Sequence, residues 1–304
     1  MKVVFASHGS LGDLVPFLEI GKVLVARGHD VSVATHPCHG PAVTAAGLGF
    51  APMRPDRPSD PSFHNRYMHP RRGPGFVYKE HLMPAIAQSD ADLSAAVEDA
   101  DILVSVTLAL AAPLVAARTG IPWRSTAFQP AMFYSAYDPP KLPLLPLFRG
   151  RVDYNEWMLQ GARRALQSWA EPLVTYRRDQ GLGEYHDHPI FGGQHSPGGV
   201  LALYSPLFGC LPEDAPPNTL QTGQVLQTGG GTLDEGVADF LSGGERPLVF
   251  TLGSASSYTA RAFFRHSVRI ARRLKMRALL LVGRPENLDG LPQDETVLAA
   301  VKAP

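Results

Sequence analysis

The amino terminus alternates between short apolar runs and glycine-containing breaks, and this alternation constrains the fold more than any other feature of the chain. Lys2 to Ser7 is a β-branched and aromatic run typical of a buried strand. A break at Gly9 to Asp13 follows, and Pro16 to Arg27 then carries apolar residues at helical spacing. Val31 to Ala34 is a second run of strand length. This order predicts a right-handed βαβ unit of a parallel sheet.

The same pattern continues along the chain and predicts an α/β fold with a Rossmann-like, doubly wound parallel sheet. Between the expected strands, residues 54–74 have the composition of an exposed loop, and residues 153–180 are expected to form one long helix. The segment 129–150 is dense in Pro and aromatic residues, and a loop of that length is usually functional or mobile. Further strands are expected at 49–52, 102–106, 123–128 and 199–204.

A second βαβ pattern begins near the carboxyl end, with strands expected at 247–252 and 277–282. We therefore expect an amino-terminal Rossmann-like domain at 1–215, a linker at 216–236 and an incomplete second Rossmann-like domain at 237–304. A parallel sheet of two or three strands leaves apolar surface uncovered. The sequence thus predicts either truncation within this domain or self-association through it.

Composition excludes several classes of protein. Lys plus Arg and Asp plus Glu each total 28, which argues against a nucleic-acid partner that binds the whole surface. Cys38 and Cys210 make no disulfide framework, and the apolar run 103–117 is too short for a membrane span. With no signal-peptide core at the start, we expect a cytoplasmic protein. Small basic clusters such as Arg71-Arg72 allow at most peripheral membrane contact.

The break after the first strand is the most informative segment for chemistry. Its glycines let the backbone approach a ligand at the carboxyl end of a parallel strand. Gly9 and Gly12 do not form a dinucleotide fingerprint, because the third glycine in register is missing, and this disfavours a nicotinamide-dependent oxidoreductase. Asp13 is either a functional carboxylate or only the cap of the following helix, and the spacing leaves both interpretations open.

Gly9 to Phe17, followed by Leu24 to Val31, resembles the amino terminus of GT-B glycosyltransferases, which have two Rossmann-like domains. The similarity is to UDP-glycosyltransferases, to the rhamnosyltransferases that make rhamnolipids, and to sterol and antibiotic glycosyltransferases. It spans nearly the whole chain, and supporting segments occur in the same order at 119–122, 205–208, 222–223 and 245–254. The resemblance implies a GT-B-like fold that binds an acceptor in the first domain and a nucleotide-diphosphate sugar in the second.

The resemblance also implies a reaction. Asp13 would be the catalytic base, and His8 is the rival because some relatives use a histidine in this loop. A carboxylate with an ordinary pKa of about 3.9 cannot deprotonate an alcohol beforehand, so proton transfer accompanies attack on the anomeric carbon. The displacement is direct and inverting, without a metal if protein donors neutralise the leaving diphosphate. No cofactor is implied beyond a UDP- or dTDP-sugar as donor substrate.

Binding residues follow from the same resemblance. Those expected at the donor are Gly12, Gly253, Ser254 and Gly283. The segment 128–148 is expected either to line an apolar acceptor pocket or to form a structural lid. A hydrophobic acceptor (a lipid, sterol, polyketide or phenolic alcohol) is therefore expected to contact Phe17, Thr107, Met132, Phe133 and Tyr134.

One departure from the family affects the expected activity. Family members continue with a His-x-Gly-Gly segment at a helix amino terminus that receives the diphosphate, and these 304 residues contain none. We therefore expect little or no transferase activity from this chain by itself. The alternative is a non-catalytic acceptor-binding module derived from such an enzyme, and a nucleotide-sugar epimerase is disfavoured. No metal site is expected, because His36, Cys38 and His39 lack the usual paired spacing.

Overall fold

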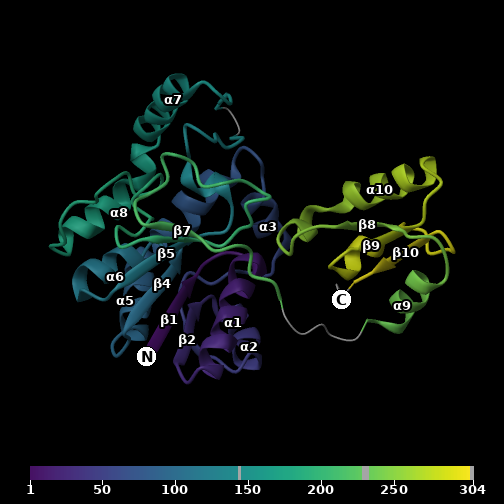
Figure 1. Cartoon of the computed structure of the whole chain (residues 1–304), viewed down its shortest axis with the longest axis horizontal. Helices are drawn as coiled ribbons and strands as arrows, with labels where there is room; N and C mark the ends of the chain where they lie inside the picture. The colour runs from purple at the N-terminus through teal and green to yellow at the C-terminus, as the bar shows by residue number, and fades with distance from the viewer. Residues whose placement is uncertain (143–144, 228–232, 302–304) are drawn as a thin grey trace. The chain divides into compact units, whose positions relative to one another are not determined.

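The computed structural model describes residues 1–142, 145–227 and 233–301 and divides the chain into two compact units. The first consists of Met1–Pro58 and Pro70–Leu226, and the second of Ser59–His69 and Gln227–Pro304 (Figure 1). The later division falls inside the expected linker at 216–236. Nothing in the sequence indicated that Ser59–His69 belongs with the second unit.

The first unit contains a parallel sheet of seven strands in the order β3-β2-β1-β4-β5-β6-β7. Val3 of β1 pairs with Val31 of β2 on one side and with Ile102 of β4 on the other. The strand order therefore reverses direction between β1 and β4, where open α/β sheets bind ligands at their carboxyl edge. The strands are β1 Lys2–Ser7, β2 Asp30–Thr35, β3 Gly49–Pro52, β4 Ile102–Val106, β5 Trp123–Ala127, β6 Val200–Ala202 and β7 Thr219–Gln221.

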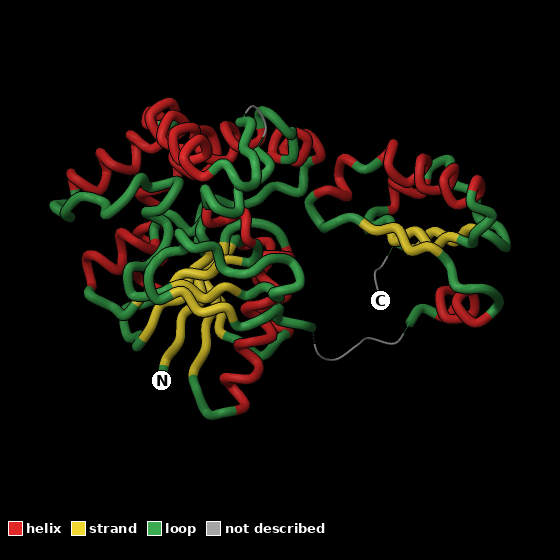
Figure 2. Tube along the Cα trace, turned by 45° about the horizontal axis from the view of Figure 1, so that its top comes forward, coloured by secondary structure: helices red, strands yellow, loops and turns green. Residues whose placement is uncertain are grey.

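Helices surround the strands of this unit (Figure 2), so the doubly wound α/β architecture expected from the sequence is confirmed. The central strands are buried on both faces, and Phe17 stacks on Phe5 of β1 with ring centroids 4.6 Å apart. The α-helices of eight or more residues are α1 Leu11–Ala26, α5 Ile86–Ala96, α6 Ala112–Thr119, α7 Val152–Ala165 and α8 Gln167–Asp179. The shorter helical segments are α2 Gly40–Ala45, α4 Gly73–Gly75, a π-helical Phe76–Leu82, and 3₁₀ turns Pro37–His39, Met83–Ala85 and Pro130–Phe133.

Two predictions about helices are wrong. The single helix expected at 153–180 is divided at Leu166 into α7 and α8. Pro172 in α8 has no N–H for the helix ladder, and its ring crowds the preceding turn, which favours a break nearby. The loop expected at 54–74 contains helix α3, Pro61–Tyr67, which Asp60 caps by accepting from the amides of Ser62 and Phe63.

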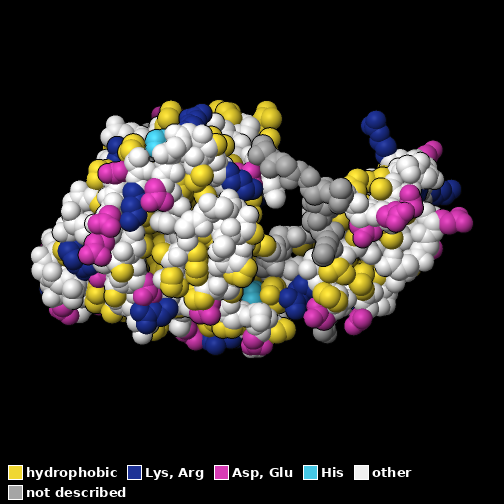
Figure 3. Space-filling view, turned by 90° about the horizontal axis from the view of Figure 1, so that it is seen from below, with side chains coloured by type: hydrophobic (Ala, Val, Ile, Leu, Met, Phe, Trp, Pro, Cys, Tyr) yellow, Lys and Arg dark blue, Asp and Glu magenta, His cyan; other side chains and the backbone are white. Residues whose placement is uncertain are grey.

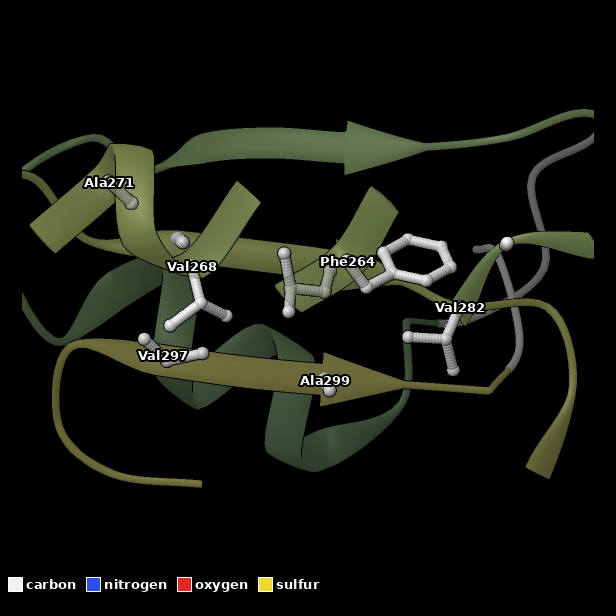
Figure 4. Packing of buried hydrophobic residues seen from close by; sticks show 9 residues of the cluster. Phe264, Val268, Ala271, Val282, Val297 and Ala299 are labelled. Carbon is white, nitrogen blue, oxygen red and sulfur yellow. The ribbon is translucent and has the colours of Figure 1, made fainter. Parts of the chain in front are cut away.

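The second unit has a parallel sheet of three strands in the order β10-β9-β8. Side chains of α10 pack against β9 and β10 and the residue after β9, as Figure 4 shows for Phe264, Val268 and Val282. Strand β10 was not expected. The elements are α9 Glu235–Ser242, β8 Leu248–Thr251, α10 Arg261–Arg273, β9 Ala278–Leu281 and β10 Val297–Ala300, with 3₁₀ turns Ser256–Thr259 and Pro285–Leu288.

On the face seen in Figure 3, basic and acidic side chains are interspersed over the larger unit. This distribution agrees with equal totals of 28 basic and 28 acidic residues. None of the helices in the described part of the chain combines the length and the hydropathy that a membrane crossing requires.

Phe264→Ala tests the core of the second unit. Phe264 is 1 % exposed, and removing a buried phenyl ring costs about 3–5 kcal/mol. We expect backbone amides in β8, β9 and β10 to lose hydrogen-exchange protection. The control is Phe263→Ala. The Phe263 ring is 38 % exposed, so its removal should reduce the protection of these amides much less. Equal protection in the two variants would contradict this packing.

Candidate functional site

The turn between β1 and α1 is organised by a reciprocal capping box. Ser10 is the N-cap of α1, and its Oγ accepts from the Gly12 amide at 3.2 Å. Asp13 Oδ2 accepts from the Ser10 amide at 2.7 Å and from its hydroxyl at 3.1 Å. Asp13 therefore does cap the helix. In the described part of the chain no hydrogen bond reaches its second oxygen, Oδ1.

Gly9 makes this arrangement of Asp13 sterically accessible. Its φ of +129° lies in a region that side-chain-bearing residues rarely adopt. A Cβ atom at this position would lie 2.3 Å from Asp13 Oδ2 and 2.8 Å from Asp13 Cγ. Gly12 is different, because a Cβ there would meet only Ser10 Oγ at 3.4 Å, an ordinary contact. Gly9 is thus required by local geometry, whereas Gly12 is not.

Different parts of the environment of Asp13 shift its pKa in opposite directions. Burial raises the pKa of the carboxyl above its ordinary value, while hydrogen bonds from Ser10 and the positive charge of Arg57 lower it. The net effect is a raised pKa. A carboxylate whose pKa lies closer to neutrality is a better general base at neutral pH.

His8, the rival base, is enclosed by other side chains. It is 3 % exposed, and its Nδ1 lies 3.4 Å from Nε2 of His36. Burial, together with the nearby His36 and His81, holds the pKa of His8 well below its ordinary value. The imidazole is consequently neutral at neutral pH. Its role as a base stays a prediction.

A cavity of about 400 Å³ lies beside the capping box at the carboxyl edge of the first sheet. Gly12 and Pro16 contribute one wall from α1, and the segments that follow β5, β6 and β7 contribute the others. All of its lining residues belong to the first unit. The remaining lining residues are Phe128, Gln129, Pro130, Leu203, Tyr204, Phe208, Gln224 and Val225.

None of the five expected acceptor residues is among the described residues that line this cavity. Phe17 is fully buried against Phe5, and Phe133 is packed against Tyr204 and the His195 ring. The half-buried side chain of Met132 packs against the buried cluster that contains Phe133 and Tyr204. These residues are core residues, and their assignment as acceptor contacts stays a prediction without structural support.

Two further expected acceptor residues also lie outside the cavity lining. Tyr134 packs on Phe191 with ring centroids 4.9 Å apart, and Thr107 follows β4 in a half-buried position. Sequence analysis missed Leu203, Tyr204 and Phe208 as candidates. Leu203 and Tyr204 end the expected strand at 199–204 and Phe208 follows it, so their place at the carboxyl end of a parallel strand was the available signal.

The aromatic segment 128–148 is fastened by buried polar groups. Asn155 of α7 is fully buried and donates to the carbonyls of Ala136 and Phe148 at 2.8 Å each. Asp214 accepts from the Ser135 hydroxyl and from the Ala136 amide. This segment was expected to be either pocket or lid. It supplies Phe128, Gln129 and Pro130 to the cavity, while Ser135, Ala136 and Phe148 are held by Asp214 and Asn155.

The expected donor residues of the second unit are brought together at the carboxyl edge of its sheet. Gly253 and Ser254 follow β8, and their carbonyls accept from the Ser257 amide and hydroxyl at 3.0 and 2.7 Å. Gly283 follows the adjacent β9 with a φ of +71°, and a Cβ there would lie 3.2 Å from Ser257 Cβ. Ser257 therefore links the two turns.

In the parts of the chain that the structure describes, no three His, Cys, Asp or Glu side chains are grouped to hold a metal ion. His36 is engaged otherwise, because its Nδ1 donates to the Pro55 carbonyl at 2.6 Å and its Nε2 accepts from the Gly9 amide at 3.1 Å. These two bonds assign the proton of the neutral ring to Nδ1.

His36 predicts a pH dependence of stability. The ring is 2 % exposed, and burial lowers its pKa to about 4. The unfolded chain, with a histidine pKa near 6.5, binds more protons between these values, so stability is complete above about pH 6.5 and is lost as the pH falls through 4. We expect His36→Gln to flatten this loss by about 3 kcal/mol in urea unfolding between pH 7 and 4. Half-exposed His29→Gln is the control, and equal slopes for both variants would contradict the assignment.

Known proteins similar to this chain are glycosyltransferases. No protein-family model matches the sequence. The O-mycaminosyltylonolide 6-deoxyallosyltransferase of Streptomyces fradiae is 29% identical over 320 residues, which cover 97% of this chain and 70% of that protein. The sterol 3-beta-glucosyltransferase of Candida albicans is 29% identical over 142 residues, covering 43% of this chain and 9% of that protein.

Solved structures with the same architecture are GT-B glycosyltransferases. The glycosyltransferase of kitacinnamycin has a TM-score of 0.67 at 20% identity, and the calicheamicin glycosyltransferase CalG4 has 0.64 at 17%. In both cases the similarity covers 100% of this chain and 71% of the other. The glycosyltransferase VinC, in complex with dTDP, has a TM-score of 0.57 at 18% identity. This similarity covers 100% of this chain and 72% of VinC. The GT-B-like fold expected from the sequence is thereby confirmed.

Proposed function

We propose that this chain is a glycosyltransferase of the GT-B type that moves a hexose or deoxyhexose to a hydroxyl group of a hydrophobic acceptor; the similar glycosyltransferases and the shared fold support this. The donor in this proposal is a dTDP- or UDP-sugar. A similar structure in complex with dTDP supports that choice. Gly253, Ser254 and Gly283 are proposed to receive the diphosphate, which is supported by their position at one sheet edge.

The observation that carries the proposal is the state of the Asp13 carboxylate. One oxygen is fixed by Ser10, and in the described part of the chain the other has no hydrogen bond. Gly12, the preceding residue, lines the adjacent 400 Å³ cavity. The capping bonds hold the carboxylate in place, so the two interpretations that the sequence left open are compatible.

The proposed reaction is a single inverting displacement. The acceptor oxygen bonds to the anomeric carbon as the bond from that carbon to the diphosphate oxygen breaks. The acceptor hydroxyl proton passes to Oδ1 of Asp13, whose raised pKa suits it to accept that proton. Phe128, Leu203 and Phe208 supply apolar walls for a hydrophobic acceptor.

Asp13→Asn tests the base. Asparagine keeps an oxygen that can accept from Ser10, so the helix cap is retained while the proton acceptor is lost. We expect sugar transfer from dTDP- and UDP-hexoses to a panel of hydrophobic alcohols to fall by about 10²- to 10⁴-fold. The assay uses protein in excess of donor, so that a single turnover of the donor is enough to be detected.

Ser10→Ala is the matched control for the cap. It removes the capping hydroxyl, at a cost of about 1 kcal/mol, but keeps the carboxylate. If Asp13 only caps the helix, Asp13→Asn, which retains the cap, should leave transfer nearly unchanged, and Ser10→Ala should impair it more. Binding of the alcohols without transfer by the unaltered chain would favour the alternative, an acceptor-binding module.

Independence from metals is a separate expected outcome. If backbone amides and the Ser254 hydroxyl neutralise the leaving diphosphate, EDTA should leave the transfer rate unchanged within a factor of about two. The measurement is the initial rate with and without EDTA, followed by added Mg²⁺. A loss restored by Mg²⁺ would contradict metal independence.

A further inference from the structure

Three neighbouring strand ends converge on the peptide groups of Gly9. The Gly9 amide donates to Nε2 of His36, which directly follows β2, at 3.1 Å. The Gly9 carbonyl accepts from Nη1 of Arg57, in the loop after β3, at 2.9 Å and more weakly from Nε2 of His39 at 3.4 Å. Both the amide and the carbonyl of Gly9, in the turn that leads into the capping box, are therefore held by side-chain hydrogen bonds.

Arg57 is well placed to fix both the shape and the charge of this turn. The side chain is 8 % exposed although arginine rarely lies so deep, and the loop that carries it is held by the bond from His36 to the Pro55 carbonyl. The positive charge of Arg57 opposes the effect of burial on the pKa of Asp13.

The other groups around Arg57 do not duplicate its charge. His8 and His39 have pKa values lowered by burial, and burial lowers those of His36 and His81 to about 4. All four are neutral at neutral pH. The neighbouring acidic residue is Asp56, whose Oδ1 accepts from the Arg57 amide at 2.7 Å. Among the basic groups named here, Arg57 therefore supplies the positive charge.

We propose that Arg57 is a positioning residue for Asp13, holding the Gly9 carbonyl and keeping a buried positive charge facing the carboxylate. His36 is the second arm of the same clamp, holding the Gly9 amide. The effect of this positioning on catalysis rests on the proposed function, in which Asp13 is the base. The proposal predicts that the clamp keeps the carboxylate ionised at neutral pH despite burial.

Carboxyl ¹³C NMR titration of the full chain tests the proposal without requiring activity. The Asp13 signal is assigned by its loss in Asp13→Asn. In Arg57→Met we expect its titration midpoint to move upward by roughly half a pH unit or more, because the facing charge is gone. In Arg57→Lys, which keeps the charge, the midpoint should return toward that of the unaltered chain.

Arg54→Met is the matched control, since Arg54 lies three residues away and pairs with Asp92 at 2.6 Å. That variant should leave the Asp13 midpoint unchanged. A midpoint in Arg57→Met equal to that of the unaltered chain, or one in Arg57→Lys displaced as far as in Arg57→Met, overturns the proposal. If Arg57→Met does not fold, Arg57→Gln takes its place: an upward displacement of the midpoint supports the proposal, and a midpoint equal to that of the unaltered chain overturns it.

The outcome is separable from that of the proposed function. Full transfer activity in Asp13→Asn would refute the base and leave the electrostatic coupling to Arg57 measurable. An unmoved titration midpoint together with loss of transfer in Asp13→Asn would refute only the positioning role.

Discussion

The missing side chain at Gly9 is the constraint on which the carboxyl edge of the first sheet depends. Asp13 Oδ2 occupies the space that a Cβ atom would need, 2.3 Å away. In that place the carboxylate can cap α1 through Ser10 and still leave its other oxygen without a hydrogen bond in the described residues. A helix cap and a proton acceptor are thus combined in one residue.

Parallel strand order explains how distant residues meet at this turn. The carboxyl ends of β1, β2 and β3 lie along one edge, so His36 and Arg57 reach the same glycine from separate strand exits. On the other side of the reversal in strand order, the exits of β5 and β6 supply Phe128 and Leu203 to the cavity. The strand order of the first unit therefore places both the side chains that hold Gly9 and the walls of the cavity at the same edge of the sheet.

Local patterns in the sequence predicted what depends on local structure. The β1–glycine–α1 segment and the doubly wound sheet were recognisable from residues close together in the chain, and the glycosyltransferase resemblance from short segments in the same order along it. Arg57 lies 48 positions from Gly9, and nothing in its own neighbourhood marks it. Phe17 was expected to contact a hydrophobic acceptor, yet its side chain is fully buried in the core. A sequence pattern alone does not show which side chains are buried where tertiary packing decides their burial.

The most direct test of this account is a crystal structure of Gly9→Ala beside one of Gly28→Ala. Gly28 also has a positive φ, +82°, but a Cβ there would meet nothing within 4 Å. The account predicts that Gly9→Ala breaks the 2.7 Å bond from the Ser10 amide to Asp13 Oδ2, whereas Gly28→Ala keeps it. An Asp13 carboxylate that stays in place in Gly9→Ala would contradict the central claim.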